Sequence, residues 1–360
     1  MILNLATHRA SSSCVLDGAS PGSAGLSIRL MDTRDALSVT RLFRKVYGFT
    51  YPIRYMYDPV RLSGMIAAGR IRSAVTVTGE ERVVGHCALV DRRDGLAAIG
   101  MALVDPEYRH SEYNTRMVVL LANEACRGTF SGICSAVMTA QVYAQRAGRH
   151  VGFRRVALVV GRISAGRTYD GVSRGRRISV AYGYLRLEDH DEASIYPPRH
   201  HREFIEAILR NAGVKRRLSD PRAGASCPHD GDWSAIHVKA TPGDDRATIE
   251  VHRYCTDTFT RVRRIMRALL ARNVEQVVLL LPLSQALTAV ATGEFERRGF
   301  FFAGVLPRCG IGDALVLQYL NGVSIDYDDI LVASEDLAEI KAYVRQHDPG
   351  VNSEKHCRRS

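Results

Sequence analysis

Residues 104–116 read V-D-P-E-Y-R-H-S-E-Y-N-T-R and decide the fold of this 360-residue chain. A strand-like run at 96–104 ends in Asp105-Pro106, and a run with helical periodicity begins just after it, at 115–125. The sequence therefore predicts a strand, a loop and a helix. The start of a helix presents unpaired backbone N–H groups beside the positive end of the helix dipole. A loop in this place suits a phosphate or diphosphate group, although the same pattern also fits a strand, turn and helix without a ligand.

These residues resemble the pyrophosphate loop of GCN5-related N-acetyltransferases (the GNAT superfamily), V-D-P-x-Y/H-R-G-x-G-[IL]-G/A. Arg109 stands at the Arg/Gln position of that pattern, whereas Glu112 and Asn114 occupy its glycine positions. Glycine lets the backbone approach an anion closely and adopt positive φ. Asn114 tolerates a left-handed conformation, but Glu112 adds a carboxylate near the expected anion. The resemblance implies a cofactor-binding loop of these residues: Val104, Arg109, His110, Ser111, Glu112, Tyr113, Asn114 and Thr115.

The flanking segments extend the resemblance to a whole fold. Strand, helix and hairpin patterns precede the loop at 26–31, 32–47, 71–78 and 83–90, with Asp32 or Thr33 as the helix cap. A strand, a short helix, Gly152-Phe153 and a further strand follow the loop between 131 and 160. The resulting order, β-α-α-β-β-β-α-β-α-β, is that of the GNAT family. The predicted fold class is therefore α/β, with a mixed twisted sheet flanked by helices.

The second half of the chain is predicted to be a degenerate repeat of the first. The earlier pattern recurs as a strand at 276–281, a helix at 284–298, Gly299-Phe300 and two further strands. Two strands and a helix precede them between 235 and 272. No phosphate-binding loop recurs there. We therefore expect two tandem lobes. The predicted boundaries are 1–25 for a disordered N-terminal segment, 26–162 for the acyltransferase lobe, 163–232 for a connecting segment, 233–350 for a degenerate second lobe and 351–360 for a disordered tail.

Three further stretches resemble a group of bacterial tandem acetyltransferase-like chains. They are Y-x-x-x-x-Y-D-P near 51–61, G-F-F-F-x-G near 299–304, and G-D-x-L-x-L-Q-Y-L-N at 312–321. That group also has T-x-H-x-x-S-Q after the fifth strand. Here Thr139 and Gln145 are kept, while Gln141 and Ala144 replace its His and Ser. If that His serves catalysis in relatives, it cannot do so in this chain.

Composition and charge restrict the partners. The formal net charge is +11, and the arginine block, which runs from Arg146 to Arg186, contains one acidic residue, Asp170. Such a block suits the phosphates of coenzyme A, an acidic acyl-carrier protein or tRNA, or it is a solvated basic face. No run approaches the roughly 18 apolar residues of a membrane span. The eight cysteines show no C-x-x-C pair, which favours a reduced, cytoplasmic protein.

Amide formation from a thioester needs a base for the amine and an acid for the leaving sulfur. The resemblance implies Tyr143, on the helix after the fifth strand, as the acid, and the residues alone also fit a tyrosine packed on the sheet. The base is left open among Glu107, Glu112 and His86, of which His86 also reads as a core histidine. The pair His200-His201 lacks a third ligand at convincing spacing and would point in different directions on a helix, so we predict no metal site.

Three functions follow from these features. The first is transfer of an acyl group, above all acetyl, from acetyl-CoA or another acyl-CoA to an amine of a small molecule or protein. The second takes the acyl group from an acyl-carrier protein or aminoacyl-tRNA bound by the arginine block. The third is a regulatory or binding module without chemistry. Asp105-Pro106, Arg109 and Tyr143 favour the first function, and Glu112 and Asn114 count against it. Variable loops build acceptor pockets, so the acceptor is not predicted.

Overall fold

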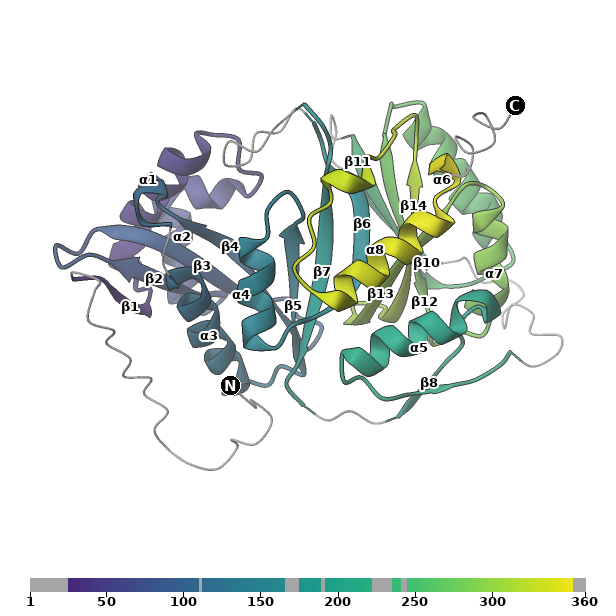
Figure 1. Cartoon of the computed structure of the whole chain (residues 1–360), viewed down its shortest axis with the longest axis horizontal. Coiled ribbons are helices and arrows are strands. Elements are labelled where there is room, and N and C mark those ends of the chain that lie inside the picture. Colours follow the sequence, from purple (N-terminus) through teal and green to yellow (C-terminus); the bar gives the residue numbers. More distant parts are fainter. Residues whose placement is uncertain are drawn as a thin grey trace.

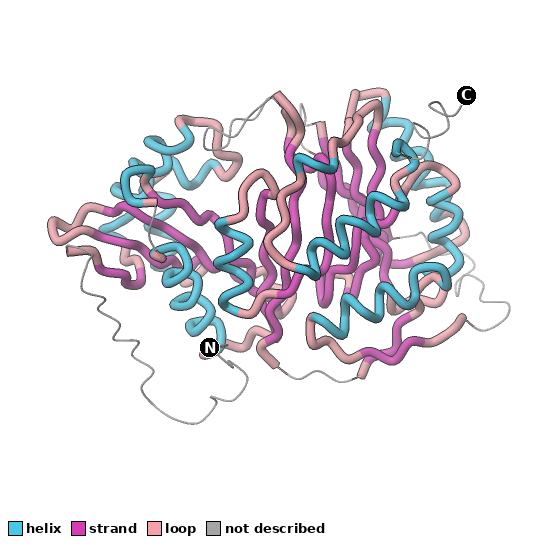
Figure 2. Tube along the Cα trace, in the orientation of Figure 1, coloured by secondary structure: helices cyan, strands magenta, loops and turns pink. Residues whose placement is uncertain are grey.

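The computed structural model describes residues 25–109, 112–165, 175–188, 192–221, 235–240 and 245–351. Apart from residues 25 and 351, the segments predicted to be disordered lie outside these ranges. One mixed sheet of twelve strands runs through both halves of the chain, with helices packed against it (Figures 1 and 2). The predicted α/β class is thereby confirmed. Within the described ranges, none of the helices has both the length and the apolar composition that a membrane crossing needs.

The N-terminal half (residues 25–188) follows the predicted order of elements. Its elements are β1 (Ser27–Leu30), α1 (Ala36–Tyr47), α2 (Pro59–Ala67), β2 (Ile71–Val77), β3 (Val83–Asp91), β4 (Leu96–Val104), α3 (Tyr113–Cys126), β5 (Gly132–Met138), α4 (Tyr143–Val151), β6 (Arg154–Ile163) and β7 (Ile178–Arg186). The sheet order is β1-β2-β3-β4-β5-β7-β6. The predicted lobe end at residue 162 is wrong in one respect, because β7 belongs to the segment predicted as a connection and yet lies between β5 and β6.

Alternation along the strands separates the two faces of this sheet. Ala74 of β2 packs in a core with α3, whereas its neighbour Val75 packs with α1 and α2. Successive side chains of a strand point to opposite faces, so α3 covers one face and α1 with α2 covers the other. On β7, Leu185 packs on the α3 face, and Val180 packs with Tyr47 of α1. The site described below extends to both of these faces.

The C-terminal half (residues 235–351) repeats the order from β3 to β7 and ends in one more helix. After the connecting elements β8 (Ala193–Ile195), α5 (Arg202–Asn211) and β9 (Arg216–Leu218), its elements are β10 (Ala235–Ala240), β11 (Arg246–Arg253), α6 (Thr258–Leu270), β12 (Gln276–Pro282), α7 (Leu287–Glu296), β13 (Phe301–Cys309), β14 (Gly312–Leu320) and α8 (Glu335–His347). The sheet continues from β6 in the order β13-β14-β12-β11-β10. Since one sheet joins both halves, the division into two lobes stays a prediction.

The two halves meet where β6 and β13 pair at a single position, Ala157 opposite Gly304. Gly304 has φ +134°, and a Cβ there would lie 2.4 Å from the Ala157 Cα and from the Val156 carbonyl oxygen. Only glycine fits so close an approach of two backbones. The helix α8 crosses this junction and packs on both β6 and β13 (Figure 1).

The segment before α8 fixes the C-terminal half to α4. The Leu331 N–H donates to the Thr139 carbonyl at 2.9 Å, and Gln145 Nε2 donates to the Leu331 carbonyl at 2.9 Å. The Ala333 N–H in turn donates to Gln145 Oε1 at 3.0 Å. Thr139 and Gln145, the two residues kept from the T-x-H-x-x-S-Q pattern, therefore have a structural task in this chain.

Two arginines of the block form ion pairs with the C-terminal half. The Arg177 side chain is 7% exposed and pairs with Asp245 of the C-terminal half. Arg176 pairs with Asp329 at 2.6 Å. Residues 166–174 of the block lie outside the described residues. These two guanidinium groups bind carboxylates of the same chain, so their charges are already paired within the protein.

Candidate active site

A gap opens in the sheet between the parallel strands β4 and β5. The two strands pair only from Leu96 opposite Gly132 to Ile99 opposite Ser135. Past that point, no ladder pair joins the described residues of β4 and β5, although β5 stays paired with β7 as far as Met138. Beyond Ile99, no strand of the described residues therefore pairs with the edge of β4 that faces β5, and a ligand that enters the gap can approach this edge.

A bulge shapes the β4 edge of this gap. His86 of β3 lies opposite Leu103 and Ala88 lies opposite Gly100, so β4 contains one extra residue, and Met101 has φ +52°. His86 supports the bulge because its Nδ1 lies 2.9 Å from the Met101 carbonyl oxygen, which can only accept a hydrogen bond. Burial lowers the pKa of His86 to about 4. His86 is thus a buried support of the bulge and does not line the cavity described next.

A cavity of about 880 Å³ extends through this gap to both faces of the sheet. On the α3 face it is lined by Asn114 of α3 and Gly148 of α4. On the other face it is lined by Tyr51 and by Tyr182 of β7. Strands β10 and β11 of the C-terminal half close it from the side with His237, Val238, Lys239, Ala240, Arg246 and Thr248. A long ligand can therefore reach from the start of α3, through the sheet, to a separate compartment beyond it.

The loop before α3 lies at the α3 end of this cavity. Glu112 is the N-cap residue of α3 with φ −72°, its side chain is exposed, and Asn114 lies within the first turn. The positive φ expected at the glycine positions is therefore absent at these two residues. Asn114 lines the cavity, and its Oδ1 is buried without a hydrogen-bond partner. An unsatisfied amide oxygen at this place is a ready acceptor for a ligand group.

The other predicted loop residues have different environments. Val104, at the end of β4, accepts a hydrogen bond through its carbonyl from Arg109 Nε at 3.3 Å. Tyr113 is buried, and Thr115 is half-buried in α3. These four residues do not line the cavity. His110 and Ser111 lie outside the described residues.

Asp105 anchors the loop and does not line the cavity. Its buried carboxylate accepts hydrogen bonds from Lys45 Nζ at 2.9 Å and Arg82 Nη2 at 3.1 Å. Burial alone would raise the pKa of Asp105, but the hydrogen bonds from Lys45 and from the Glu107 N–H outweigh it and lower the pKa. The Asp of the V-D-P stretch therefore ties the loop to α1 and to the β2–β3 hairpin.

Two tyrosines near the gap differ in their position relative to the cavity. Tyr143 begins α4 as predicted, but it is 72% exposed and does not line the cavity, so the geometry disfavours it as the acid. Tyr182 does line the cavity and is paired in register with Ala136, one residue beyond the last β4–β5 pair. No sequence pattern points to Tyr182, because the segment that contains β7 is predicted as a connection.

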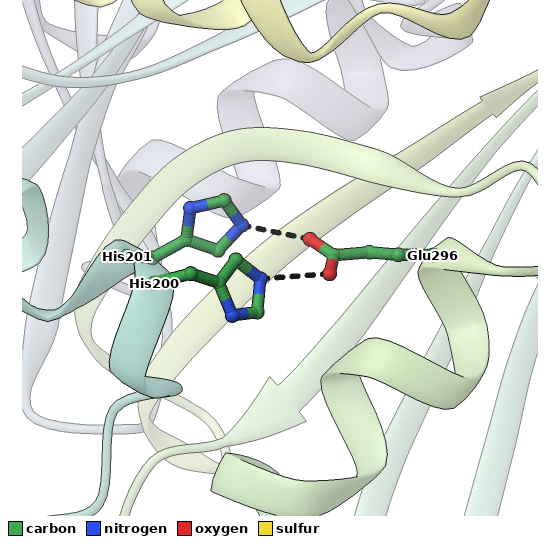
Figure 3. Close-up of side chains that lie close together, drawn as sticks. All are labelled: His200, His201 and Glu296. Atoms are coloured by element: carbon green, nitrogen blue, oxygen red, sulfur yellow. Dashed lines mark hydrogen bonds and ion pairs between the residues drawn. The ribbon is translucent and has the colours of Figure 1, made fainter.

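A second group of titratable side chains lies outside the cavity lining (Figure 3). His200 Nε2 and His201 Nε2 donate to the two oxygens of Glu296 at 2.8 and 2.7 Å. The expectation that the two histidines point apart is wrong, since both reach one carboxylate. His201 Nδ1 also lies 2.8 Å from the Tyr343 hydroxyl. The cluster ties the start of α5 to α7 and α8, and the absence of a metal site stays a prediction.

No family model matches the sequence, and no curated protein matches it. Among solved structures, the chain is similar to the ribosomal-protein-S5-alanine acetyltransferase from Vibrio fischeri, with 12% identity over 46% of this chain and 96% of that chain and a TM-score of 0.37. It is also similar to yncA, a putative acetyltransferase from Salmonella typhimurium with its cofactor acetyl-CoA (15% identity, 46% and 96% coverage, TM-score 0.39). A third is a GNAT-superfamily phosphinothricin acetyltransferase from Sinorhizobium meliloti in complex with acetyl-CoA (16%, 46% and 91%, 0.37). At these identities and scores, the activity of this chain has to be inferred from its own geometry.

Proposed function

We propose that this protein is an N-acyltransferase that moves an acyl group, above all acetyl, from a coenzyme A thioester to an amine. The observation that carries the proposal is the cavity that crosses the sheet at the β4–β5 gap. A thioester donor entering from the α3 face would place its pantetheine arm along the free edge of β4. Its diphosphate would lie at the start of α3, where N–H groups and the helix dipole favour an anion.

The chemistry at the gap is a single acyl transfer. A neutral amine nitrogen attacks the thioester carbonyl carbon, the N–C bond forms and the C–S bond breaks. One N–H proton is lost to the medium or a nearby base, and the leaving sulfur takes up a proton. Backbone N–H groups at the bulge around Met101 are suited to polarise the carbonyl oxygen. We assign the proton donor to Tyr182, which lines the acceptor side of the gap.

The donor is tested by filling the gap. Ala136 faces the cavity, so Ala136→Phe should block the pantetheine path, and Ala68→Phe, on an exposed helix end, is the matched control. Calorimetric titration with CoA and acetyl-CoA at low and moderate salt should show binding to the wild type and to the control and at least about a tenfold loss in Ala136→Phe. Equal binding by all three proteins would place the donor elsewhere. No binding to the wild type would refute the proposal.

A further inference from the structure

The wall that the C-terminal half adds to the cavity is positively charged. Lys239 of β10 and Arg246 of β11 line it, and Arg162 joins them from the end of β6. The Arg162 guanidinium donates to Gln276 Oε1 at 2.7 Å and to Thr248 Oγ1 at 3.0 Å, which holds it against β11. Three formal cations from three strands therefore border one compartment.

No Asp or Glu occurs among the described residues that line this cavity. One carboxylate beside the wall, Glu250, pairs with Lys239 and lies 3.5 Å from His237 Nδ1. His252 Nε2 lies 3.6 Å from the same carboxylate, which is thus shared by three basic side chains. Arg162 and Arg246, which have partners of their own, also border the cavity. In a confined cavity with low-dielectric walls, such an imbalance attracts an anion and disfavours a cation.

The cationic wall faces the acceptor side of the sheet. On β11, Ala247 and Ile249 pack in the core beneath the helices of the C-terminal half, so Thr248 points to the opposite face. Lys239 pairs in register with Thr248 and shares that face. The loop expected to hold the donor phosphates lies at the α3 face of the sheet. The wall is therefore placed to contact the acceptor, beyond the gap.

We propose that the acceptor amine carries an anionic group, a carboxylate or a phosphate, which Lys239, Arg246 and Arg162 hold while the amine lies at the β4–β5 gap. This inference rests on the proposed acyltransferase function. It assigns the C-terminal half the task of acceptor selection. Polycations such as spermidine are expected to be rejected, because they would place positive charge against this wall.

The test uses amines that differ only in charge. Wild-type protein saturated with CoA is titrated calorimetrically with β-alanine against β-alaninamide, which lacks the carboxylate, with phosphoethanolamine against ethanolamine, and with spermidine. One or both anionic amines should bind at least about tenfold more tightly than the neutral counterpart, as expected for one charge-assisted contact, and spermidine should bind least. The two pairs distinguish a carboxylate from a phosphate. Equal binding within both pairs, or tightest binding of spermidine, would overturn the proposal.

Charge reversal locates the site. Lys239→Glu and Arg246→Glu should each weaken binding of the preferred anionic amine at least about tenfold and leave CoA affinity unchanged. Lys215→Glu, at an exposed position outside the cavity lining, is the matched control. If the two reversals weaken CoA instead, the wall holds the donor and the acceptor proposal fails while the acyltransferase proposal stands. If the wild type binds no CoA, the acyltransferase proposal itself fails.

Discussion

The contact between β6 and β13 at Gly304 predicts a large and selective loss of stability in Gly304→Ala. A Cβ at this position would overlap the Ala157 Cα and the Val156 carbonyl oxygen at 2.4 Å, and these are backbone atoms that cannot rotate away. The residue also has φ +134°, which L-amino acids rarely adopt. Backbone strain of about 1–3 kcal/mol and overpacking of about 1–3 kcal/mol together predict a loss of about 3–5 kcal/mol in the free energy of unfolding.

Gly312→Ala is the control, because Gly312 has φ +83° but nothing within 4 Å of its added Cβ. This change should cost only the backbone term, about 1–2 kcal/mol. Urea unfolding followed by far-UV circular dichroism measures both variants. Because Gly304 joins the halves, Gly304→Ala should also weaken amine binding more than CoA binding. Equal losses of stability in the two variants would show that β6 and β13 do not approach as closely as described.

Two further changes test the site and the cluster of His200, His201 and Glu296. If the Tyr182 hydroxyl protonates the leaving sulfur, Tyr182→Phe should lower kcat by about 10²-fold or more. Tyr143→Phe should leave kcat within about twofold of the wild-type value. The reverse result would identify Tyr143, and not Tyr182, as the acid. Burial raises the pKa of Glu296, but hydrogen bonds from both histidines outweigh it and lower the pKa from 4.5 to about 2. The ionised Glu296 therefore stabilises the fold fully above pH 4.5, and this effect is lost as the pH falls towards 2. At pH 6, Glu296→Gln should have a free energy of unfolding about 1–2 kcal/mol below that of the wild type, after discounting for exposure. Between about pH 5 and pH 3, the variant should lose less stability than the wild type does. Parallel stability–pH curves for the wild type and Glu296→Gln would contradict this assignment.

Local patterns predicted the elements of the N-terminal half well. The run at 96–104 became β4 with the expected bounds, and Asp32 caps the first helical turn through a hydrogen bond from the Arg34 N–H at 2.7 Å. Such features depend on neighbours in the sequence, such as strand alternation and the side chain that satisfies the first N–H groups of a helix. A single sequence discloses them without knowledge of the tertiary structure.

Features that depend on distant contacts were missed or misread. The charge of Arg177 suggested an external partner, but Asp245, 68 positions away, is its partner within the chain. Gln145 was read as part of a family pattern, and its contacts lie 186 and 188 positions away. Tyr182 is not predicted locally because β7 enters the sheet between β5 and β6, out of chain order. No local pattern encodes such pairings, since long-range contacts decide them.

The continuous sheet places part of the C-terminal half beside the cavity of the N-terminal half. The N-terminal half contains the β4–β5 gap, the bulge and the start of α3, where the proposed thioester donor would bind. Its acceptor side would be open without β10 and β11. The continuous sheet brings those strands around so that Lys239 and Arg246 close the compartment, and the β6–β13 contact at Gly304 fixes their distance from the gap. Under the proposed function, the C-terminal half contributes the charged wall, and the residues that join it to the other half keep that wall in place. The contacts of Gly304, Thr139 and Gln145 fit that division of labour.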